Sequence, residues 1–163
     1  MKDFIRIPQK RNNIFKKNDK LKGRIEEFTN TKIELNDEIS IEGESVDVFQ
    51  AKNVIKAFGR GFNLDDCFYL LEDEYGLEII NLSEFTKTKE RLKILKGRII
   101  GSDGKTKKYI EKYTDVKTSI FGKTVGIIGK WNKINIAREA IMKLIKGCSH
   151  QTLYRWLERQ AKK

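Results

Sequence analysis

The stretch that decides the fold is residues 96–114, KGRIIGSDGKTKKYIEKYT, in which two glycines are separated by two residues and followed by lysine and threonine. Two kinds of site share this pattern. A nucleotidase phosphate loop ends in glycine, lysine and serine or threonine. A Gly-x-x-Gly loop between two helices can instead bring its backbone against the sugar-phosphate chain of a single-stranded nucleic acid. The residues around the motif distinguish these two interpretations.

The nucleotidase interpretation fails on spacing and context. Its first glycine would have to lie five residues before Gly104, where the chain has Ile99. The loop should also follow a buried strand, but LKILKGRII (residues 92–100) is basic and has the apolar spacing of a helix. No second acidic strand offers a magnesium ligand, and we therefore favour the nucleic-acid loop.

The chain contains an internal repeat, which predicts two copies of one module. IEGESVDVFQAKNVIKAFGRGF (residues 41–62) aligns with IIGKWNKINIAREAIMKLIKGC (residues 127–148) at a constant offset of 86, and TNTKIEL (residues 29–35) aligns with TDVKTSI (residues 114–120) at an offset of 85. A change of one residue is what a hairpin turn tolerates. We expect a first module over residues 1–82 and a second over residues 83–163, joined near residues 82–87.

Hydrophobic periodicity predicts the same order of elements in both copies. In the first copy we expect a strand, two short helices, a strand hairpin and a longer helix, over residues 4–7, 10–15, 20–28, 31–35, 38–43 and 46–58. In the second copy we expect two helices around the glycine motif, a hairpin and a helix buried through Ile134, Ala137, Ile141 and Leu144, with the first four elements over residues 91–100, 105–112, 116–120 and 124–129. An extra helix ends each copy, over residues 64–74 and 150–163. No strand is predicted in front of the second copy.

The predicted order of elements in the second copy resembles that of the type I KH domain. This order is helix, Gly-x-x-Gly loop, helix, strand, strand and helix. The resemblance implies an α+β fold of two tandem type I KH modules, each a three-stranded antiparallel sheet with three helices on one face. It also implies that the loop clamps four nucleotides of single-stranded RNA, with the bases in an apolar groove beside the second strand. The predicted RNA-binding residues are Arg98, Ile100, Gly101, Ser102, Asp103, Gly104, Lys105, Thr106, Lys107, Lys108, Ser119, Ile120 and Phe121.

These residues have different expected roles. The glycines allow close approach of the backbone, and the basic side chains attract phosphate. Ile100 and residues 119–121 are candidates for the groove, although the apolar ones fit a core equally well. Asp103 departs from the pattern because a carboxylate weakens a phosphate clamp. Tyr109 and Tyr113 could stack on bases, but packing between helices is the better explanation.

The first copy lacks the glycine motif. At an offset of 85, residues 16–19 read KKND where the second copy reads GSDG. Without glycine the backbone cannot approach phosphate as closely, although the expected loop is rich in lysine. We expect the first module to serve mainly as a scaffold or protein-docking unit, with nonspecific phosphate contact.

The net charge of +11 lies in the second half of the chain. Residues 1–82 carry 13 Lys and Arg against 16 Asp and Glu, whereas residues 83–163 carry 21 against 7. A surplus of this kind favours a polyanionic partner, with nucleic acid ahead of membrane.

Composition argues against most other chemistry. Cys67 and Cys148 are isolated and each is expected to be a buried free thiol, and His150 is the single histidine, so we predict no metal site, no cofactor and no catalytic constellation. No segment has the length of an apolar membrane span, and the N-terminus lacks the pattern of a secretory signal. We expect a soluble, cytoplasmic and monomeric protein.

The whole chain resembles the archaeal ribosome-assembly KH proteins related to the eukaryotic partner-of-Nob-one (Dim-two) and Krr-one families. The resemblance is carried by VIKAFGRGFNLDDCFYLLEDEYGLEIINL (residues 54–82), RLKILKGRIIGSDGKT (residues 91–106), FGKTVGIIG (residues 121–129), AREAIMKLIKG (residues 137–147) and HQTLYRWLE (residues 150–158). KKND is a departure, since archaeal relatives often keep Gly-x-x-Gly in the first module as well.

This resemblance implies a non-enzymatic factor that binds the 3′ region of small-subunit ribosomal RNA (rRNA) during its processing. It also implies two protein partners, the Nob-one endonuclease and the alpha subunit of initiation factor two. An adaptor with incidental RNA affinity is the alternative, and an enzyme or an exosome-type cap is less well supported, since no oligonucleotide-binding barrel accompanies the modules.

Overall fold

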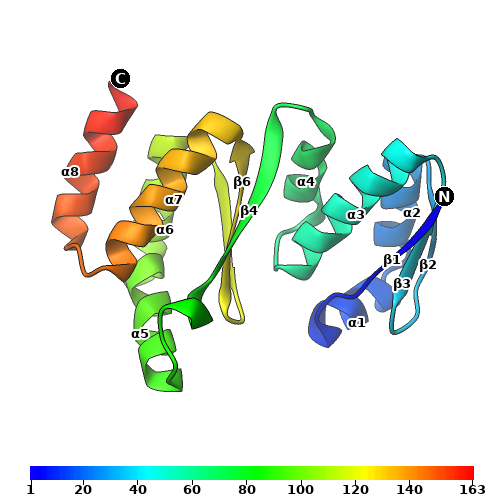
Figure 1. Cartoon of the computed structure of the whole chain (residues 1–163), viewed down its shortest axis with the longest axis horizontal. Helices are drawn as coiled ribbons and strands as arrows, with labels where there is room; N and C mark the ends of the chain where they lie inside the picture. Colours follow the sequence, from blue (N-terminus) through cyan, green and yellow to red (C-terminus); the bar gives the residue numbers. More distant parts are fainter. The chain divides into compact units, whose positions relative to one another are not determined.

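The computed structural model describes residues 1–163, and the chain divides into two compact units, residues 1–73 and 74–163. Each unit has its own three-stranded antiparallel sheet (Figure 1). We refer to them as the first and the second unit. This architecture confirms the α+β prediction of two tandem modules with one order of elements.

The first unit has a central strand flanked by two others, in the order β1-β3-β2. Its elements are β1 (Lys2–Ile5), α1 (Gln9–Lys17), α2 (Asp19–Thr29), β2 (Lys32–Glu34), β3 (Ile39–Glu42), α3 (Ser45–Gly59) and α4 (Leu64–Cys67). Phe15, Ile25, Ile41 and Ile55 are fully buried and bring α1, α2, β3 and α3 into one core.

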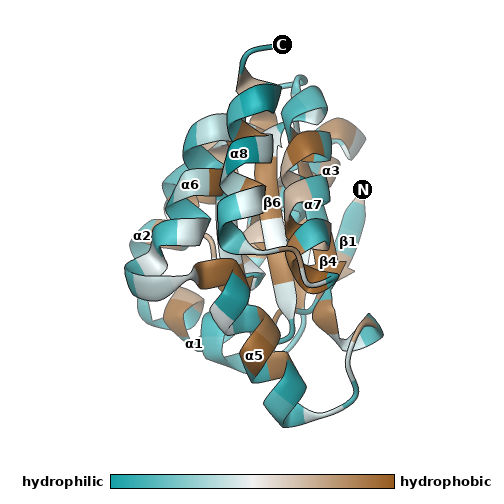
Figure 2. Ribbon diagram, turned by 90° about the vertical axis from the view of Figure 1, so that its left-hand side faces the viewer, coloured by the Kyte–Doolittle hydropathy of each residue, from teal (hydrophilic) through white to brown (hydrophobic).

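The second unit has the equivalent sheet order, β4-β6-β5. Its elements are β4 (Tyr75–Asn81), α5 (Lys89–Ile100), α6 (Lys105–Thr114), β5 (Lys117–Phe121), β6 (Thr124–Lys130), α7 (Trp131–Ile145) and α8 (His150–Ala161). Strand β6 lies behind the helices of this unit, and much of it is apolar (Figure 2). Because β6 is paired on both sides, all of its residues except Lys130 are buried. The predicted stripe of α7 is confirmed, since Ile134, Ala137, Ile141 and Leu144 are all buried.

Equivalent hydrogen bonds in the two units confirm the repeat. The amide of Ile33 donates to Glu26 Oε2, and the amide of Thr118 donates to Glu111 Oε2, both at 2.9 Å. A guanidinium in the first helix of each unit donates to carbonyl oxygens at the C-terminal end of the third helix. Arg11 bonds the carbonyls of Phe58 and Phe62, and Arg98 bonds those of Leu144 and Cys148.

Strand β4 and the boundary between the units were predicted wrongly. Residues 75–81 were assigned to the end of the first module, but β4 pairs with β6 along its whole length, for example Glu78 with Ile127. The first unit therefore ends at Asp73 instead of residue 82. The connection from first strand to first helix is three residues long in the first unit and seven in the second, so an alignment at a fixed offset could not find β4.

The extra helices also differ from each other. In the second unit α8 is a twelve-residue helix, close to the prediction. In the first unit the helix expected over residues 64–74 is only the four residues of α4, followed by a 3-10 turn over Phe68–Leu71. The chain then goes directly into β4, which leaves no room for a longer helix.

Candidate nucleic-acid interface

The GSDG motif forms a tight turn between α5 and α6. Gly101 ends α5 with φ 77° and ψ 172°, and a 3-10 turn over Ser102–Gly104 leads into α6. Three of the four residues have positive φ, since Asp103 has φ 56° and Gly104 has φ 74°. The chain reverses here with little side-chain bulk, as the sequence predicts.

The two glycines are required for different reasons. A Cβ at Gly101 would lie 2.2 Å from Thr106 Oγ1 and 2.7 Å from Thr106 N, so residue 101 packs directly on the start of α6. A Cβ at Gly104 would meet only Lys108 Cε, at 3.9 Å. Gly104 therefore faces open space, where a phosphate group can reach the backbone.

The left-handed backbone explains the choice of aspartate at residue 103. Only glycine and, less readily, the short polar residues Asn and Asp take this conformation routinely. The side chain of Asp103 is exposed and has no ion-pair partner. Its carboxylate therefore remains an unfavourable charge beside the turn, although its conformation is accounted for.

The backbone N–H groups of this turn lie at the N-terminal end of α6. The amides of Gly101, Gly104 and Lys105 are used by the turn itself. No side chain caps α6. The uncapped N-terminal end of a helix attracts anions, so the turn has the chemistry of a phosphate site.

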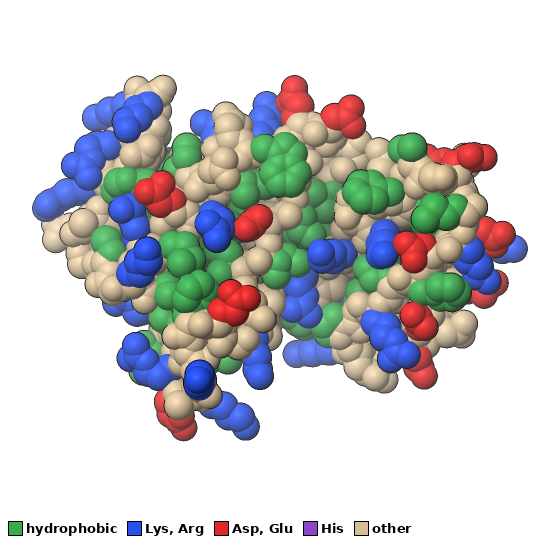
Figure 3. Space-filling view, viewed as in Figure 1, with side chains coloured by type: hydrophobic (Ala, Val, Ile, Leu, Met, Phe, Trp, Pro, Cys, Tyr) green, Lys and Arg blue, Asp and Glu red, His purple; other side chains and the backbone are tan.

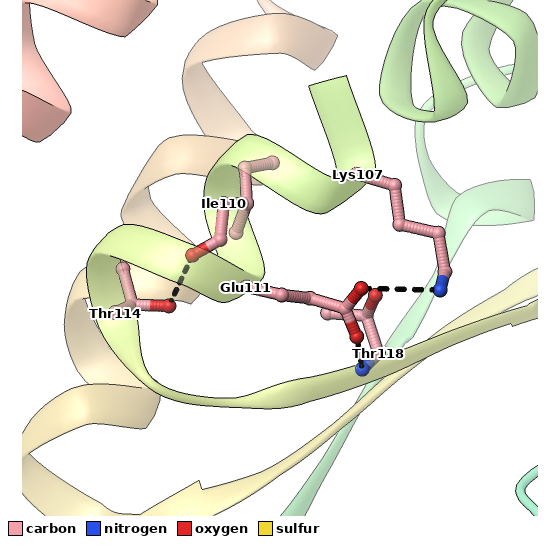
Figure 4. Close-up of polar contacts among 5 residues, drawn as sticks. All are labelled: Lys107, Ile110, Glu111, Thr114 and Thr118. Atoms are coloured by element: carbon pink, nitrogen blue, oxygen red, sulfur yellow. Dashed lines mark hydrogen bonds and ion pairs between the residues drawn. The ribbon is translucent and has the colours of Figure 1, made fainter. Parts of the chain in front are cut away.

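The predicted lysines lie on two sides of α6. Lys107 points toward β5 and forms an ion pair with Glu111 at 3.3 Å, and the same carboxylate accepts from Thr118 N (Figure 4). Lys105 and Lys108 lie away from β5, since both line a groove along α6 that also includes Tyr109. The structure therefore brings only Lys107 next to the predicted groove.

Arg98 and Thr106 contact the protein itself. The guanidinium of Arg98 donates to the carbonyls of Leu144 and Cys148 at the end of α7. Thr106 is buried, and its Oγ1 forms a hydrogen bond of 2.9 Å with the hydroxyl of Tyr154. Both side chains position the turn, and contact of either with RNA stays a prediction.

The predicted groove residues lie on α5 and on β5, which is an edge strand of the sheet. Ile100, Ser119, Ile120 and Phe121 are all half-buried, and Ile120 packs partly on the core. Sequence reasoning did not select Thr118, whose buried Oγ1 has no hydrogen-bond partner.

The tyrosines pack between helices, which the sequence favoured over stacking on bases. Tyr109 stacks on Tyr154 of α8 with ring centroids 4.1 Å apart, and its hydroxyl donates to Glu158. This hydrogen bond, assisted by one with Tyr113, raises the pKa of Tyr109.

The first unit has no comparable turn. Lys16 and Lys17 end α1, Asn18 is the only residue between the helices, and Asp19 begins α2. The side chain of Asn18 accepts a hydrogen bond from the amide of Lys20 and so caps the N-terminal end of α2. The prediction of a lysine-rich loop here is therefore wrong, because the two helices follow each other without a loop.

Charge still separates between the units, although slightly less than between the predicted halves of the chain. Residues 1–73 carry 13 Lys and Arg against 14 Asp and Glu, and residues 74–163 carry 21 against 9. Lys and Arg side chains gather over α5 and α8 (Figure 3). The unit that has the glycine turn is thus also the basic one.

Neither a metal site nor a membrane span is found. No group of three or more His, Cys, Asp and Glu side chains could hold a metal ion, and no helix is long and apolar enough to cross a membrane. Burial raises the pKa of the Cys67 thiol to about 12, with a smaller contribution from Asp66, whereas Cys148 is only half-buried. The prediction of a buried thiol is confirmed for Cys67 and wrong for Cys148.

Comparison with known proteins agrees with this geometry. The family model for the second KH domain of PNO1 proteins, described as eukaryotic type KH-domain (KH-domain type I), matches residues 76–162. The chain is also 34% identical over 169 residues to KH domain-containing protein MJ0443 of Methanocaldococcus jannaschii, covering 99% of this chain and 74% of that protein. The chain belongs to the PNO1-type KH family.

Other members of this KH family include eukaryotic proteins and solved archaeal structures. Pre-rRNA-processing protein PNO1 of Saccharomyces cerevisiae is 37% identical over 102 residues, which cover 61% of this chain and 37% of that protein. Dim2p from Pyrococcus horikoshii OT3 is 36% identical, with a TM-score of 0.88 over 98% of this chain and 99% of that one. A solved complex of a/eIF2alpha, aDim2p and rRNA from the same organism matches with a TM-score of 0.91 and 36% identity, over 99% of this chain and 94% of the matched chain.

Proposed function

We propose that this protein is a single-stranded RNA-binding factor of small-subunit rRNA processing that holds the rRNA backbone with the GSDG turn of its second unit. The observation that carries the proposal is the open face of Gly104 at the start of α6, which no side chain caps. A phosphate placed there would accept from backbone N–H groups, and the surplus of positive charge in the same unit would attract it.

The relatives support RNA of this class. Members of the family are named pre-rRNA-processing proteins, and the archaeal relative with a TM-score of 0.91 was solved together with rRNA. Our proposed substrate is the 3′ region of small-subunit rRNA. Its bases would lie between α5, α6 and β5, where Ile100, Ile120 and Phe121 offer apolar contacts.

The first unit would bind protein. It has no glycine turn and no surplus of positive charge, yet Val46 and Phe49 on α3 are 69% and 65% exposed. The alpha subunit of initiation factor two is the partner we propose, since it occurs in the complex with aDim2p. The Nob-one endonuclease is a further candidate, and the protein would act in the cytoplasm without a catalytic activity of its own.

A substitution at Gly104 tests the RNA-binding turn. We expect Gly104→Asp to lower the affinity for a four-nucleotide RNA from the rRNA 3′ region at least tenfold, because the new carboxylate would point into the space for phosphate. Fluorescence anisotropy at several salt concentrations measures the affinity, which should fall steeply as salt rises.

Two control variants separate repulsion from strain and from net charge. Gly104→Asn has a side chain of the same size and a similar tolerance of the left-handed backbone but no carboxylate, and should retain most of the binding. Gly23→Asp places the same charge on α2 of the first unit, where a Cβ meets nothing within 4 Å. Full affinity in a folded Gly104→Asp variant would contradict the proposed function.

A further inference from the structure

Helix α6 has a second basic side, which lies away from β5. Lys108 and Tyr109 lie three and four residues after Lys105, and Lys112 lies four and three residues after them, so all four share one side of the helix. Lys107 and Glu111 lie on the other side, next to Thr118. A strand of RNA confined to the groove beside β5 would contact the side of α6 that carries Lys107. It would leave unused the other side, which carries Lys105, Lys108 and Lys112.

This second side of α6 packs against α8. Tyr109 donates to Glu158 and stacks on Tyr154, whose hydroxyl bonds Thr106. The ammonium of Lys105 lies 5.7 Å from the centroid of the Tyr154 ring. The tyrosines thus form a rigid partly apolar floor, and lysines border it.

Two grooves lie on this side, and both begin at the GSDG turn. A groove of about 440 Å³ is lined by Ser102, Lys105, Thr106, His150, Gln151 and Tyr154. A second groove, of about 320 Å³, is lined by Asp103, Lys105, Lys108, Tyr109 and Lys112. Lys105 is common to both, and each groove includes a residue of the turn. The larger groove thus reaches from the turn to the start of α8.

The N-terminal end of α8 adds to the positive potential of the larger groove. The amides of His150 and Gln151 have no partner within the chain, whereas that of Thr152 is capped by Ser149. The larger groove therefore lies at the N-terminal ends of two helices, α6 and α8. In the first unit α4 has four residues and no such surface forms, so the long extra helix occurs only where the glycine turn occurs.

We propose that this surface, which we call the α6–α8 face (Ser102, Lys105, Lys108, Tyr109, Lys112, Gln151 and Tyr154), binds the RNA nucleotides adjoining the four held beside β5. The strand would cross the GSDG turn, with its phosphates near the lysines and its sugars and bases over the tyrosine floor. This inference rests on the proposed function, because it extends the same bound strand.

RNA length separates the two sites in an experiment. The affinity of the full chain is measured for a four-nucleotide RNA and for a ten-nucleotide RNA that contains it. We expect the longer RNA to bind more tightly, and Lys108→Gln with Lys112→Gln to weaken it about five- to tenfold, several times more than it weakens the four-nucleotide RNA, because of the two lysines only Lys108 lies beside Gly104. The salt dependence of the longer RNA should fall by about one to two in log–log slope, as expected for two lost phosphate contacts.

A matched variant controls for net charge. Lys10→Gln with Lys17→Gln removes two exposed lysines from α1 of the first unit, and both RNA lengths should bind it as they bind the unmodified protein. In addition, a photoreactive uridine placed outside the central four nucleotides should crosslink to residues 147–155, which include the start of α8.

The outcomes distinguish the two proposals. If the unmodified protein binds neither RNA, the proposed function itself fails. If it binds both lengths with equal affinity, or if the double lysine variant loses both equally, the four-nucleotide site stands and the α6–α8 face is overturned. Crosslinks of the outer uridine only to other parts of the chain would also overturn it.

Discussion

At the scale of single residues, backbone conformation and packing restrict which residue types fit at three positions of GSDG. Gly101 packs so closely on Thr106 that no side chain fits, whereas Gly104 needs glycine for its backbone angle and leaves the space beside it open. Asp103 tolerates the left-handed conformation between them. A substitution at Gly104 can therefore test RNA binding without disturbing the packing of the turn, whereas a substitution at Gly101 cannot.

The two glycines should differ in their effect on stability. Gly101→Ala should lower the free energy of unfolding by about 2–5 kcal/mol, because left-handed strain adds to a clash with Thr106 N and Oγ1. Gly104→Ala should cost about 1–2 kcal/mol, from strain alone. Urea denaturation measures both, and equal losses would contradict the different packing of the two residues.

At the scale of elements, the angle between helices depends on a half-buried arginine in each unit. Arg98 ties α5 to the end of α7 through two carbonyls, and Arg11 ties α1 to α3 in the same way. His150 adds a contact from α8, since its Nε2 lies 2.9 Å from the carbonyl oxygen of Arg98. Hydrogen bonds to the end of α7 and to α8, which do not contain the motif, thus hold the turn in place.

Loss of this guanidinium should act on stability more than on RNA binding. Arg98→Met leaves the carbonyls of Leu144 and Cys148 without their donor and should cost about 1–3 kcal/mol in urea denaturation. The affinity for the four-nucleotide RNA should change less than in Gly104→Asp. Arg11→Met is the matched variant in the first unit. A large loss of RNA affinity in folded Arg98→Met would instead indicate direct contact with phosphate.

At the scale of the whole molecule, two units of one fold have diverged in surface chemistry. The second unit carries the glycine turn, the long helix α8 and a balance of 21 basic against 9 acidic residues. The first unit is nearly neutral and exposes Val46 and Phe49. This division favours RNA on one unit and protein on the other.

The division between units predicts that the two partners respond to separate substitutions. In the full chain, Val46→Ser with Phe49→Ser should weaken binding of the alpha subunit of initiation factor two about tenfold without affecting RNA, because only exposed apolar area is lost. Gly104→Asp should do the reverse. Titration calorimetry with RNase-treated components measures the protein interaction. Loss of both partners in either folded variant would contradict separate surfaces.

The sequence alone determined the repeat, the order of helices and hairpins, the glycine turn and the half that carries positive charge. These features are local, because periodicity and a short motif encode them within a few residues. Tertiary structure decided that residues 75–81 complete the second sheet, because strand pairing joins residues distant in sequence and the connection after β4 differs in length from that after β1. It also decided that Lys105 and Lys108 face α8 while Lys107 faces β5, because the side of α6 that each lysine occupies has meaning only once α8 and β5 are packed against it.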